Sequence, residues 1–360
     1  MQKIKLYKIQ KKSHVSAMPM HGFFFIKRKE KYVKTRIALW DNLKFLLIML
    51  VVIGHFMELF LNQSNMYSSL SLFIYTFHMP LFLFVSGLFH KNKNVGQKCI
   101  FFISVGFIQK MVFAIVRYII GAGMTFSFLS EGGIPWFMFV LSVYTLITYL
   151  LRNQNKEYIC LFSIMLACFV GYDKEVGDFL CLSRMLVFYP IYLLGTIVSD
   201  EKIKDVKKNK WVGWISLVIL IAWLFICFYD REKVIILKHL FTGRNYFSPS
   251  IYSYGAFMRL LCYIITFFVG ASIIFLMPSK KIKWISAMGE RTIDVYFWHW
   301  PVYMLLNRFF HINKLLSWGA KGKVVLLLIA VIVTFVLSQG GIISYPLNLI
   351  KSCCYKKQNN

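Results

Sequence analysis

Residues 36–58, "RIALWDNLKFLLIMLVVIGHFME", contain an apolar run long enough to cross a lipid bilayer. The hydrocarbon core of a bilayer is about 30 Å thick, and a helix needs roughly 20 apolar residues to span it. The same stretch also contains an acid, a base and an imidazole, namely Asp41, Lys44 and His55. Lipid rejects such groups unless they face a polar interior of the protein. The stretch therefore predicts a membrane helix with a polar stripe along one face.

The composition of the whole chain favours the same class of protein. Hydrophobic residues make up 58% of the 360 residues, and only 16% are charged. Because a water-soluble chain of this size could not cover its surface at that ratio, we expect an integral membrane protein. We predict an all-α, polytopic helical bundle of about ten transmembrane helices, with both termini cytoplasmic. The apolar runs lie at residues 37–61, 66–90, 99–122, 134–151, 157–172, 182–199, 211–229, 252–277, 292–310 and 322–345.

The net charge of +27 would fit a nucleic-acid-binding protein, but the distribution of the basic residues favours a membrane topology. With the N-terminus inside, 28 of the 42 lysine and arginine residues fall in segments that face the cytoplasm, among them 152–156 and 199–210. The loops 62–65 and 123–133, on the opposite side, contain none. This asymmetry follows the positive-inside rule. We therefore expect the basic segments to face anionic lipid, and we expect no nucleic-acid partner.

Three parts are predicted along the chain: a basic cytoplasmic arm at 1–36, a membrane domain at 37–345 and a short cytoplasmic tail at 346–360. The arm has a basic start but no small-residue cleavage site, which argues against a cleaved signal peptide. The eight cysteines lack the spacing of metal ligands, and most of them lie in the apolar runs. We therefore expect neither a disulfide framework nor a metal site.

The polar residues of the first run share one helical face. The step of 11 residues from Lys44 to His55 leaves about 20° after whole turns and spans about 16 Å along the axis. Asp41 and Lys44 could form an interfacial pair that extends to the inner headgroups. His55 lies too deep for that, and a functional role is favoured. Histidine suits proton transfer because its unperturbed pKa of about 6.5 lets it accept and return a proton near neutral pH.

Two further histidines, His78 and His299, each stand two residues before a proline inside an apolar run. A proline removes a backbone donor, and irregular backbone at membrane depth is tolerated only where it is buried in protein or lines a cavity. Alone, His78 would fit a satisfied core histidine better than a functional one, but three buried histidines on separate helices indicate a polar interior. From the helix rise, His55 lies about 9 Å and His78 about 18 Å from the outer ends of their runs, and His299 about 10 Å from the inner end. We therefore expect His299 near the cytoplasmic entrance, away from the other two rings.

Two arginines, Arg184 and Arg259, add positive charge to the apolar runs. A guanidinium inside a membrane pairs with a carboxylate, a phosphate or a carbonyl. Because the runs contain few acids, an anionic ligand would balance this charge; alternatively, both arginines reach the outer water from span ends. The residues that we expect to form the polar interior, for substrate binding or for structure, are Arg184, Arg259, His299 and Glu58.

Five motifs carry a resemblance to a known family. They are "WDNLKFLLIMLVVIGHF", "YTFHMPLFLFVSGLF", "PWFMFVLSVY", "SRMLVFYPIYLLG" and "GERTIDVYFWHWPV", spread in this order over residues 40–302. Together they resemble the acyltransferase 3 family of membrane proteins, and most closely its fucose 4-O-acetylase-like branch. The resemblance implies about ten transmembrane helices, a location in the bacterial plasma membrane, and transfer of an acyl group from cytoplasmic acetyl-CoA. The implied acceptor is a hydroxyl of a cell-surface polysaccharide or of its lipid-linked precursor.

The family's first-helix pattern is an acid, a base three residues on, and a histidine eleven residues after the base. It falls on Asp41, Lys44 and His55, although the base is more often arginine in the family. The catalytic residues that the resemblance implies are His55, Asp41 and His78. The acyl-CoA-binding residues that it implies are Lys44, Lys98 and Lys110.

These assignments predict direct transfer with His55 as the general base, since an alcohol attacks a thioester without a metal. A transient acetyl-histidine is the alternative, because imidazole is also a nucleophile. We expect no bound cofactor, acetyl-CoA as co-substrate, a sugar or polysaccharide acceptor, and contact with membrane lipid. The rival reading is a transporter or flippase of a lipid-linked sugar, since broken helices and buried charge are also transporter features. No inverted repeat of two halves is apparent, and a purely structural role is the least specific reading.

The predicted topology can be tested by labelling single cysteines, introduced into a cysteine-depleted chain, with a membrane-impermeant reagent. Residues 1–36 and 200–210 should react only after the cytoplasmic side is opened, and residues 231–250 should react in intact cells. The reversed pattern would overturn the topology and with it the direction of transfer.

Overall fold

The computed structural model describes residues 37–355 apart from residues 59, 125, 129–132, 178 and 245. The predicted basic arm and the last residues of the predicted tail lie outside the described residues. Regular structure is entirely helical in the part of the chain that the structure describes. The prediction of an all-α fold is confirmed.

The helices follow one another along the chain, and the widest interval between two of them, residues 120–135, is only partly described. The first half contains α1 (Ala38–Glu58), η1 (Leu61–Gln63), α2 (Asn65–Tyr75), α3 (His78–Leu88), α4 (Val95–Ile119), α5 (Trp136–Leu150), α6 (Lys156–Phe169), η2 (Val170–Tyr172) and α7 (Leu182–Ile197). The second half contains α8 (Asp200–Lys207), α9 (Lys210–Tyr229), α10 (Arg231–Val234), α11 (Leu237–Phe241), η3 (Pro249–Tyr254), α12 (Gly255–Leu276), α13 (Lys283–Gly289), α14 (Thr292–Phe310), η4 (Ile312–Trp318), α15 (Gly319–Leu337) and α16 (Tyr345–Cys354).

Within the described residues, six helical segments are long and apolar enough to cross a membrane. They are α1, α2 with α3, α4, α9, η3 with α12, and η4 with α15. A seventh arises if α7 and α8, which are bent by 80° at their junction, count as one broken span, and α5 is a shorter apolar helix. These helices make the chain a multi-pass membrane protein. The predicted number of about ten crossings stays a prediction.

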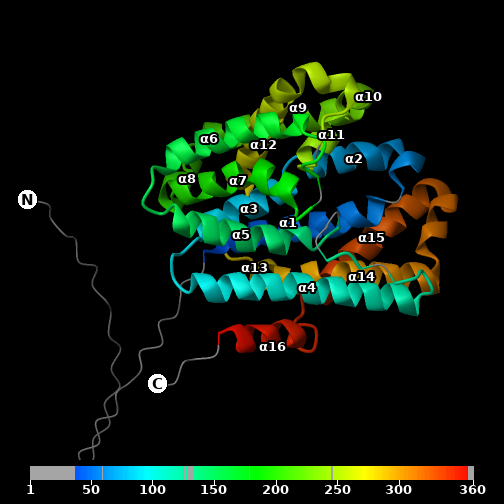
Figure 1. Cartoon of the computed structure of the whole chain (residues 1–360). Coiled ribbons are helices and arrows are strands. Elements are labelled where there is room, and N and C mark those ends of the chain that lie inside the picture. The colour runs from blue at the N-terminus through cyan, green and yellow to red at the C-terminus, as the bar shows by residue number, and fades with distance from the viewer. Residues whose placement is uncertain are drawn as a thin grey trace, which may run out of the picture. The chain divides into compact units, whose positions relative to one another are not determined.

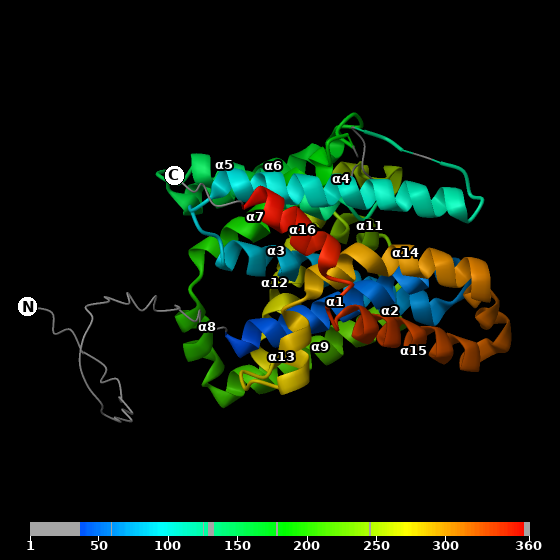
Figure 2. The same ribbon diagram turned by 90° about the horizontal axis from the view of Figure 1, so that it is seen from below.

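Helix α1 lies at the centre of the bundle. It packs against α2, α3, α13, α14 and α15, and Figures 1 and 2 show it enclosed by these helices. In its apolar window 67% of the residues are buried, against 17% for α9 at the periphery. The helix that carries the polar stripe is thus shielded from lipid by its neighbours, as the cost of polar groups in a membrane requires.

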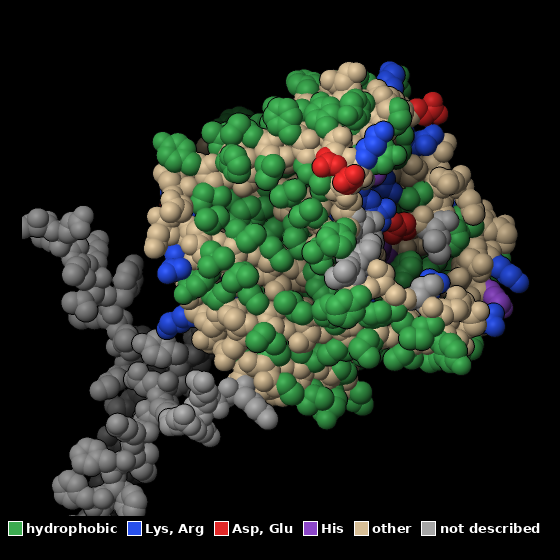
Figure 3. All heavy atoms as spheres, viewed as in Figure 1, with side chains coloured by type: hydrophobic (Ala, Val, Ile, Leu, Met, Phe, Trp, Pro, Cys, Tyr) green, Lys and Arg blue, Asp and Glu red, His purple; other side chains and the backbone are tan. Residues whose placement is uncertain are grey.

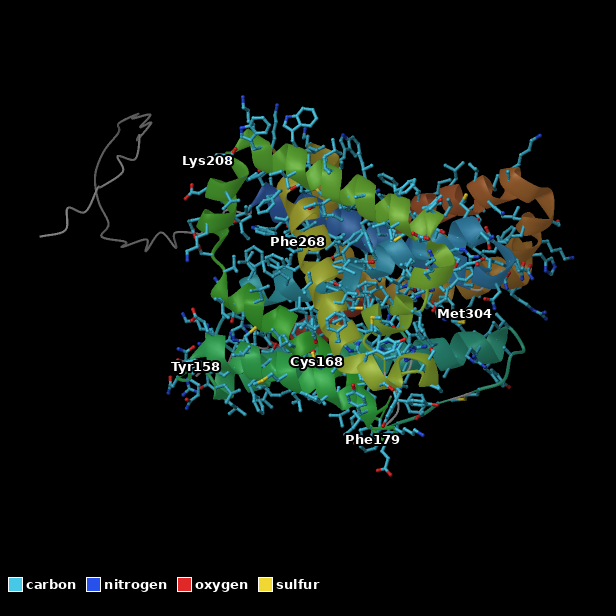
Figure 4. The ribbon with its side chains drawn as sticks, turned by 90° about the horizontal axis from the view of Figure 1, so that it is seen from above. Tyr158, Cys168, Phe179, Lys208, Phe268 and Met304 are labelled. Carbon is cyan, nitrogen blue, oxygen red and sulfur yellow. The ribbon has the colours of Figure 1, made fainter. Side chains whose placement is uncertain are left out.

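The connections between helices gather at the two ends of the bundle. In Figure 4, Tyr158 of α6 and Lys208 after α8 lie at one end, whereas Met304 of α14 lies toward the other. This agrees with the prediction that 152–156 and 199–210 lie on one side of the membrane. Which side that is stays a prediction.

The first turn of α1 is held against α13 and the residues just before it by hydrogen bonds and by a close backbone contact. The Asn42 amide donates to the Lys280 carbonyl at 3.0 Å and accepts from the Ser286 hydroxyl at 2.7 Å. A Cβ added to Gly289 would lie 1.8 Å from the Asp41 carbonyl oxygen, so only glycine fits there. The last residue of α13 therefore contacts α1, and α14, which follows, begins next to α1.

Helices α3 and α7 cross with their backbones almost touching. A Cβ on Gly87 of α3 would lie 2.0 Å from a carbonyl oxygen of α7, and one on Gly195 of α7 would lie 2.1 Å from a carbonyl oxygen of α3. Small residues permit such close packing of membrane helices. The two helices begin near His78 and Arg184, so this crossing fixes the relative positions of two predicted site residues.

Gly87→Val should therefore force α3 away from α7 and destabilise the fold by about 1–3 kcal/mol or more, as overpacking does. Thermal unfolding followed by tryptophan fluorescence should show a lower midpoint for this variant. Gly213→Ala is the matched control, because nothing lies within 4 Å of a Cβ at that position in α9. An unchanged midpoint for Gly87→Val would show that the crossing does not hold the helices together.

Candidate functional site

A cavity of about 700 Å³ lies between α1, α2, α3, α14, the starts of α5 and α7, and the segment around α11. Its walls combine aromatic rings with charged side chains and histidines. Figure 3 shows a hollow in which basic, acidic and histidine side chains gather on an otherwise largely hydrophobic face. The residues that the argument below uses are His55, Glu58, Tyr75, His78, Trp136, Arg184, Lys238, Arg244, Tyr296 and Trp300.

The last turn of α1 presents a histidine and a carboxylate to this cavity. His55 and Glu58 are three residues apart and so lie on one helical face, with 3.0 Å between His55 Nδ1 and Glu58 Oε2. An ionised carboxylate only accepts hydrogen bonds, so the proton of this bond lies on Nδ1. His55 Nε2 then keeps a lone pair, and the carboxylate can stabilise the ring when it becomes charged. His55, with Glu58 as its hydrogen-bond partner, could therefore act as a general base.

The ring of His299, from α14, stacks on the ring of His55. The centroids are 5.3 Å apart and the ring planes meet at 29°. His299 Nδ1 donates to the Val295 carbonyl at 3.0 Å, and its buried Nε2 has no hydrogen-bond partner among the described residues. His299 is thus a neutral ring stacked on His55, and its Nε2, like that of His55, carries no proton.

The expectation that depth would keep His299 apart from His55 is wrong. The sequence estimate counted both helices from the ends of their apolar runs, but Gly289 already contacts Asp41 inside α1. Counted from that contact, the two histidines lie only about one helical turn apart in depth, and not about three.

The predicted break before Pro80 is confirmed, and it brings His78 to the same cavity. Helix α2 ends at Tyr75 and α3 begins at His78, so the proline falls in the first turn, where its missing donor costs least. His78 Nδ1 donates to the Ile74 carbonyl at 2.8 Å. Its ring meets the Tyr75 ring edge-on, with the centroids 4.7 Å apart. His55 and His78 thus line one cavity, as the sequence predicted.

The cavity also contains cations. Arg184, which the sequence analysis assigned to the polar interior, lies with its guanidinium 5.0 Å from the centroid of the Trp136 ring. Lys238 and Arg244, which the sequence analysis did not single out, line the cavity from the segment between α9 and α12. The available signal was their place in a loop predicted to be outer, where the positive-inside rule disfavours basic residues.

Arg259 is buried in α12 but does not line the cavity. Its guanidinium donates to the Leu240 carbonyl at 2.7 Å and to the Arg244 carbonyl at 3.3 Å. It therefore satisfies backbone groups of the loop that carries two of the cavity's cations.

The residues predicted to bind acyl-CoA lie in different places. Lys44 forms an ion pair with Asp41 at 2.7 Å near the other end of α1. Lys98 donates to the Lys91 carbonyl at 2.6 Å, and Lys110 lies 5.6 Å from the centroid of the Phe126 ring and lines a second cavity of about 200 Å³. The structure brings none of these three lysines to the cavity at His55, and their roles stay predictions.

The described residues thus form an apolar helical bundle with a partly buried histidine–carboxylate pair at the wall of a cavity. The family model described as "Acyltransferase domain" matches residues 37–341. The chain belongs to the acyltransferase 3 family and is a membrane acyltransferase, as the five motifs predicted. The fucose 4-O-acetylase-like branch stays a prediction. No curated protein and no solved structure matches the chain.

Glu58→Gln should lower kcat of acyl transfer roughly 10²-fold, because a neutral amide neither fixes the His55 proton on Nδ1 nor stabilises the charged ring. Formation of the acylated product measures this rate. Glu232→Gln is the matched control, since Glu232 is exposed and lies outside the cavity. Wild-type turnover in Glu58→Gln would show that His55 works without the carboxylate.

Proposed function

We propose that this acyltransferase moves an acetyl group from cytoplasmic acetyl-CoA to a hydroxyl of a cell-surface polysaccharide or of its lipid-linked precursor, in the plasma membrane of a bacterium. The observation that carries the proposal is the His55–Glu58 pair at the wall of a cavity of about 700 Å³. The family match supports acyl transfer, and the donor and the acceptor follow from the resemblance in the motifs.

The proposed chemistry needs one base and two oriented substrates. His55 Nε2 takes the proton from the acceptor hydroxyl while the hydroxyl oxygen attacks the carbonyl carbon of the thioester. The new ester C–O bond forms, the C–S bond breaks, and the imidazolium returns its proton to the leaving thiolate. Glu58 stabilises the imidazolium between these two transfers, at the 3.0 Å distance of its hydrogen bond. Transfer through an acetyl-histidine is the alternative route.

The other histidines would act on this step from two sides. His78 lines the cavity and can hydrogen-bond to a substrate through Nε2, since Nδ1 is used by the Ile74 carbonyl. His299 lies against the ring of His55 and limits the positions that this ring can take. We assign His78 to the substrate and His299 to the placement of the base.

The donor would approach from the opposite end of α1. Lys44 is 11 residues before His55, which is about 16 Å along the helix. In CoA the long pantetheine arm separates the thioester from the phosphates. A single molecule can therefore place its phosphates near Lys44 and its thioester near His55. Lys98 and Lys110 stay candidates for contacts with the same nucleotide.

A transporter or flippase of a lipid-linked sugar was the rival reading of the sequence. The family match favours acyl transfer instead. A hydrogen-bonded histidine–carboxylate pair in the cavity also fits a chemical step, which transport does not need.

The proposal predicts that His55→Asn abolishes acetylation of the glycan and leaves membrane insertion intact. Labelled acetyl-CoA, the purified protein in nanodiscs and the cell's own glycan fraction as acceptor provide the assay. His311→Asn is the matched control, because His311 follows α14 with a positive φ of 50° that asparagine tolerates, and it does not line the cavity. A wild-type amount of acetylated glycan from His55→Asn would contradict the mechanism.

A further inference from the structure

Lys238 is an ionisable side chain at the wall of the same cavity as His55. It comes from the short helix α11, whereas His55 and Glu58 come from the last turn of α1. The charges of Lys238 and Glu58 are close enough to interact. Within the described residues, however, the Glu58 carboxylate pairs with His55 and not with Lys238. The structure thus adds an ammonium to the surroundings of the histidine–carboxylate pair.

The ammonium of Lys238 is held by an aromatic ring. It lies 4.9 Å from the centroid of the Tyr75 ring, within the range of a cation–π contact. A ring face attracts the positive charge and leaves the three N–H donors of the ammonium for a hydrogen-bond acceptor. Among the described residues, no hydrogen bond or ion pair takes up these donors. They are therefore available to a ligand in the cavity.

The positions of the ammonium and of the ring are fixed by packing. In α11, Leu237 and Leu240 are buried, and the guanidinium of Arg259 donates to the Leu240 carbonyl at 2.7 Å. The Tyr75 ring lies against α1, where a Cβ added to Gly54 would lie 3.2 Å from it. A charge that is fixed before the reaction stabilises developing charge without the cost of reorganisation. The packing of α11 and of the ring meets this condition.

Acyl transfer needs such a charge at one atom. When a hydroxyl attacks an acyl carbonyl, an electron pair moves onto the carbonyl oxygen, and a donor at that oxygen lowers the barrier. The histidines do not supply this donor, because His78 and His299 donate through Nδ1 to backbone carbonyls and their neutral rings carry no proton on Nε2. His55 takes the hydroxyl proton in the proposed step, and the Glu58 carboxylate repels an oxyanion. Lys238 has both the charge and the donors.

We propose that Lys238 is a catalytic residue, whose ammonium stabilises the oxyanion that forms at the acyl carbonyl during transfer. The inference rests on the proposed function, because it requires the acyl carbonyl to react beside His55. The acceptor oxygen bonds to the carbonyl carbon while the π pair of the carbonyl moves onto its oxygen. The ammonium donates an N–H to that oxygen and keeps its proton. The carbonyl then reforms, the C–S bond breaks, and the leaving thiolate takes the proton from His55.

The charge of Lys238 sets an upper pH limit for this step. Burial lowers its pKa to about 8, while the charge of Glu58 opposes this shift and the charge of Arg244 adds to it. The ammonium is present below this pKa and is lost as the pH rises through it, so kcat should fall above about pH 8.

Other groups of the cavity do not account for a fall in this range. Besides His55, the titratable or charged residues that line it with Lys238 are Glu58, Tyr75, His78, Arg184, His239 and Arg244. Carboxyl groups and imidazoles ordinarily release their protons below about pH 7, and tyrosine releases its proton near about pH 10. Arginine stays charged throughout. A fall between these limits is therefore assigned to Lys238.

Lys238→Met tests the assignment in nanodiscs, with labelled acetyl-CoA and the cell's own glycan fraction as acceptor. It should lower kcat about 10²–10³-fold, as the loss of one oxyanion donor does. The KM for acetyl-CoA should change little, because the oxyanion exists only in the transition state. Lys233→Met is the matched control, because Lys233 is exposed, pairs with Asp230 at 3.1 Å and does not line the cavity. Wild-type kcat in Lys238→Met, or a raised KM with an unchanged kcat, would overturn the assignment.

Lys238→Arg separates the charge of the side chain from a purely structural contact. The guanidinium stays protonated, so this variant should keep more activity than Lys238→Met, and its kcat should not fall between about pH 7 and pH 9.5 as that of the wild type does. A cation–π contact that only supports the fold would leave the pH profile unchanged. A loss as large as in Lys238→Met, or an alkaline fall at the wild-type pH, would overturn the inference. This comparison is independent of the stability of Lys238→Met.

His55→Asn in the same assay separates this inference from the proposed function. Abolished transfer in His55→Asn together with wild-type kcat in Lys238→Met would overturn the inference and leave the proposed function standing. Transfer by His55→Asn at the wild-type rate would contradict the proposed function and the inference with it, because the acyl carbonyl would then not react beside His55.

Discussion

Lipid cannot solvate the ionisable side chains of α1, and this constraint explains the arrangement of the other helices. Five helices enclose α1, and they leave a cavity at the turn that carries His55 and Glu58. At the opposite end, Asp41 pairs with Lys44. The polar stripe is therefore solvated by the protein, with an ion pair at one end and a cavity at the other.

The cavity is shaped by close backbone contacts and by breaks in helices. The crossing of α3 and α7 at Gly87 and Gly195 sets the positions of the two helix starts that carry His78 and Arg184. The contact of Gly289 with α1 brings α14 in at the depth where the His299 ring can stack on His55. Backbone packing thus places the imidazoles, and hydrogen bonds to carbonyls and to Glu58 then fix their protons.

The sequence predicted those features that depend on local chemistry. An apolar run with a polar stripe indicated α1, a proline two residues after His78 indicated the break between α2 and α3, and five motifs indicated the family, which the family model confirms. The meeting of His55 with His299 was missed, because helix depth depends on where α13 packs and not on the length of an apolar run. Lys238 was missed because α11 (Leu237–Phe241) lies outside the ten apolar runs in which buried charge was sought. The pairing of Glu58 with His55 became clear only from the structure, although the spacing of three residues between them could have indicated it.

The central claim is that thioester and hydroxyl meet in the cavity beside His55. An experimental structure of the protein with a non-hydrolysable acetyl-CoA analogue tests it most directly. The account predicts that the acyl carbonyl lies in this cavity within reach of His55 and that the nucleotide lies toward Lys44, at the other end of α1. An analogue whose acyl end lies outside the cavity, away from His55, would contradict the account.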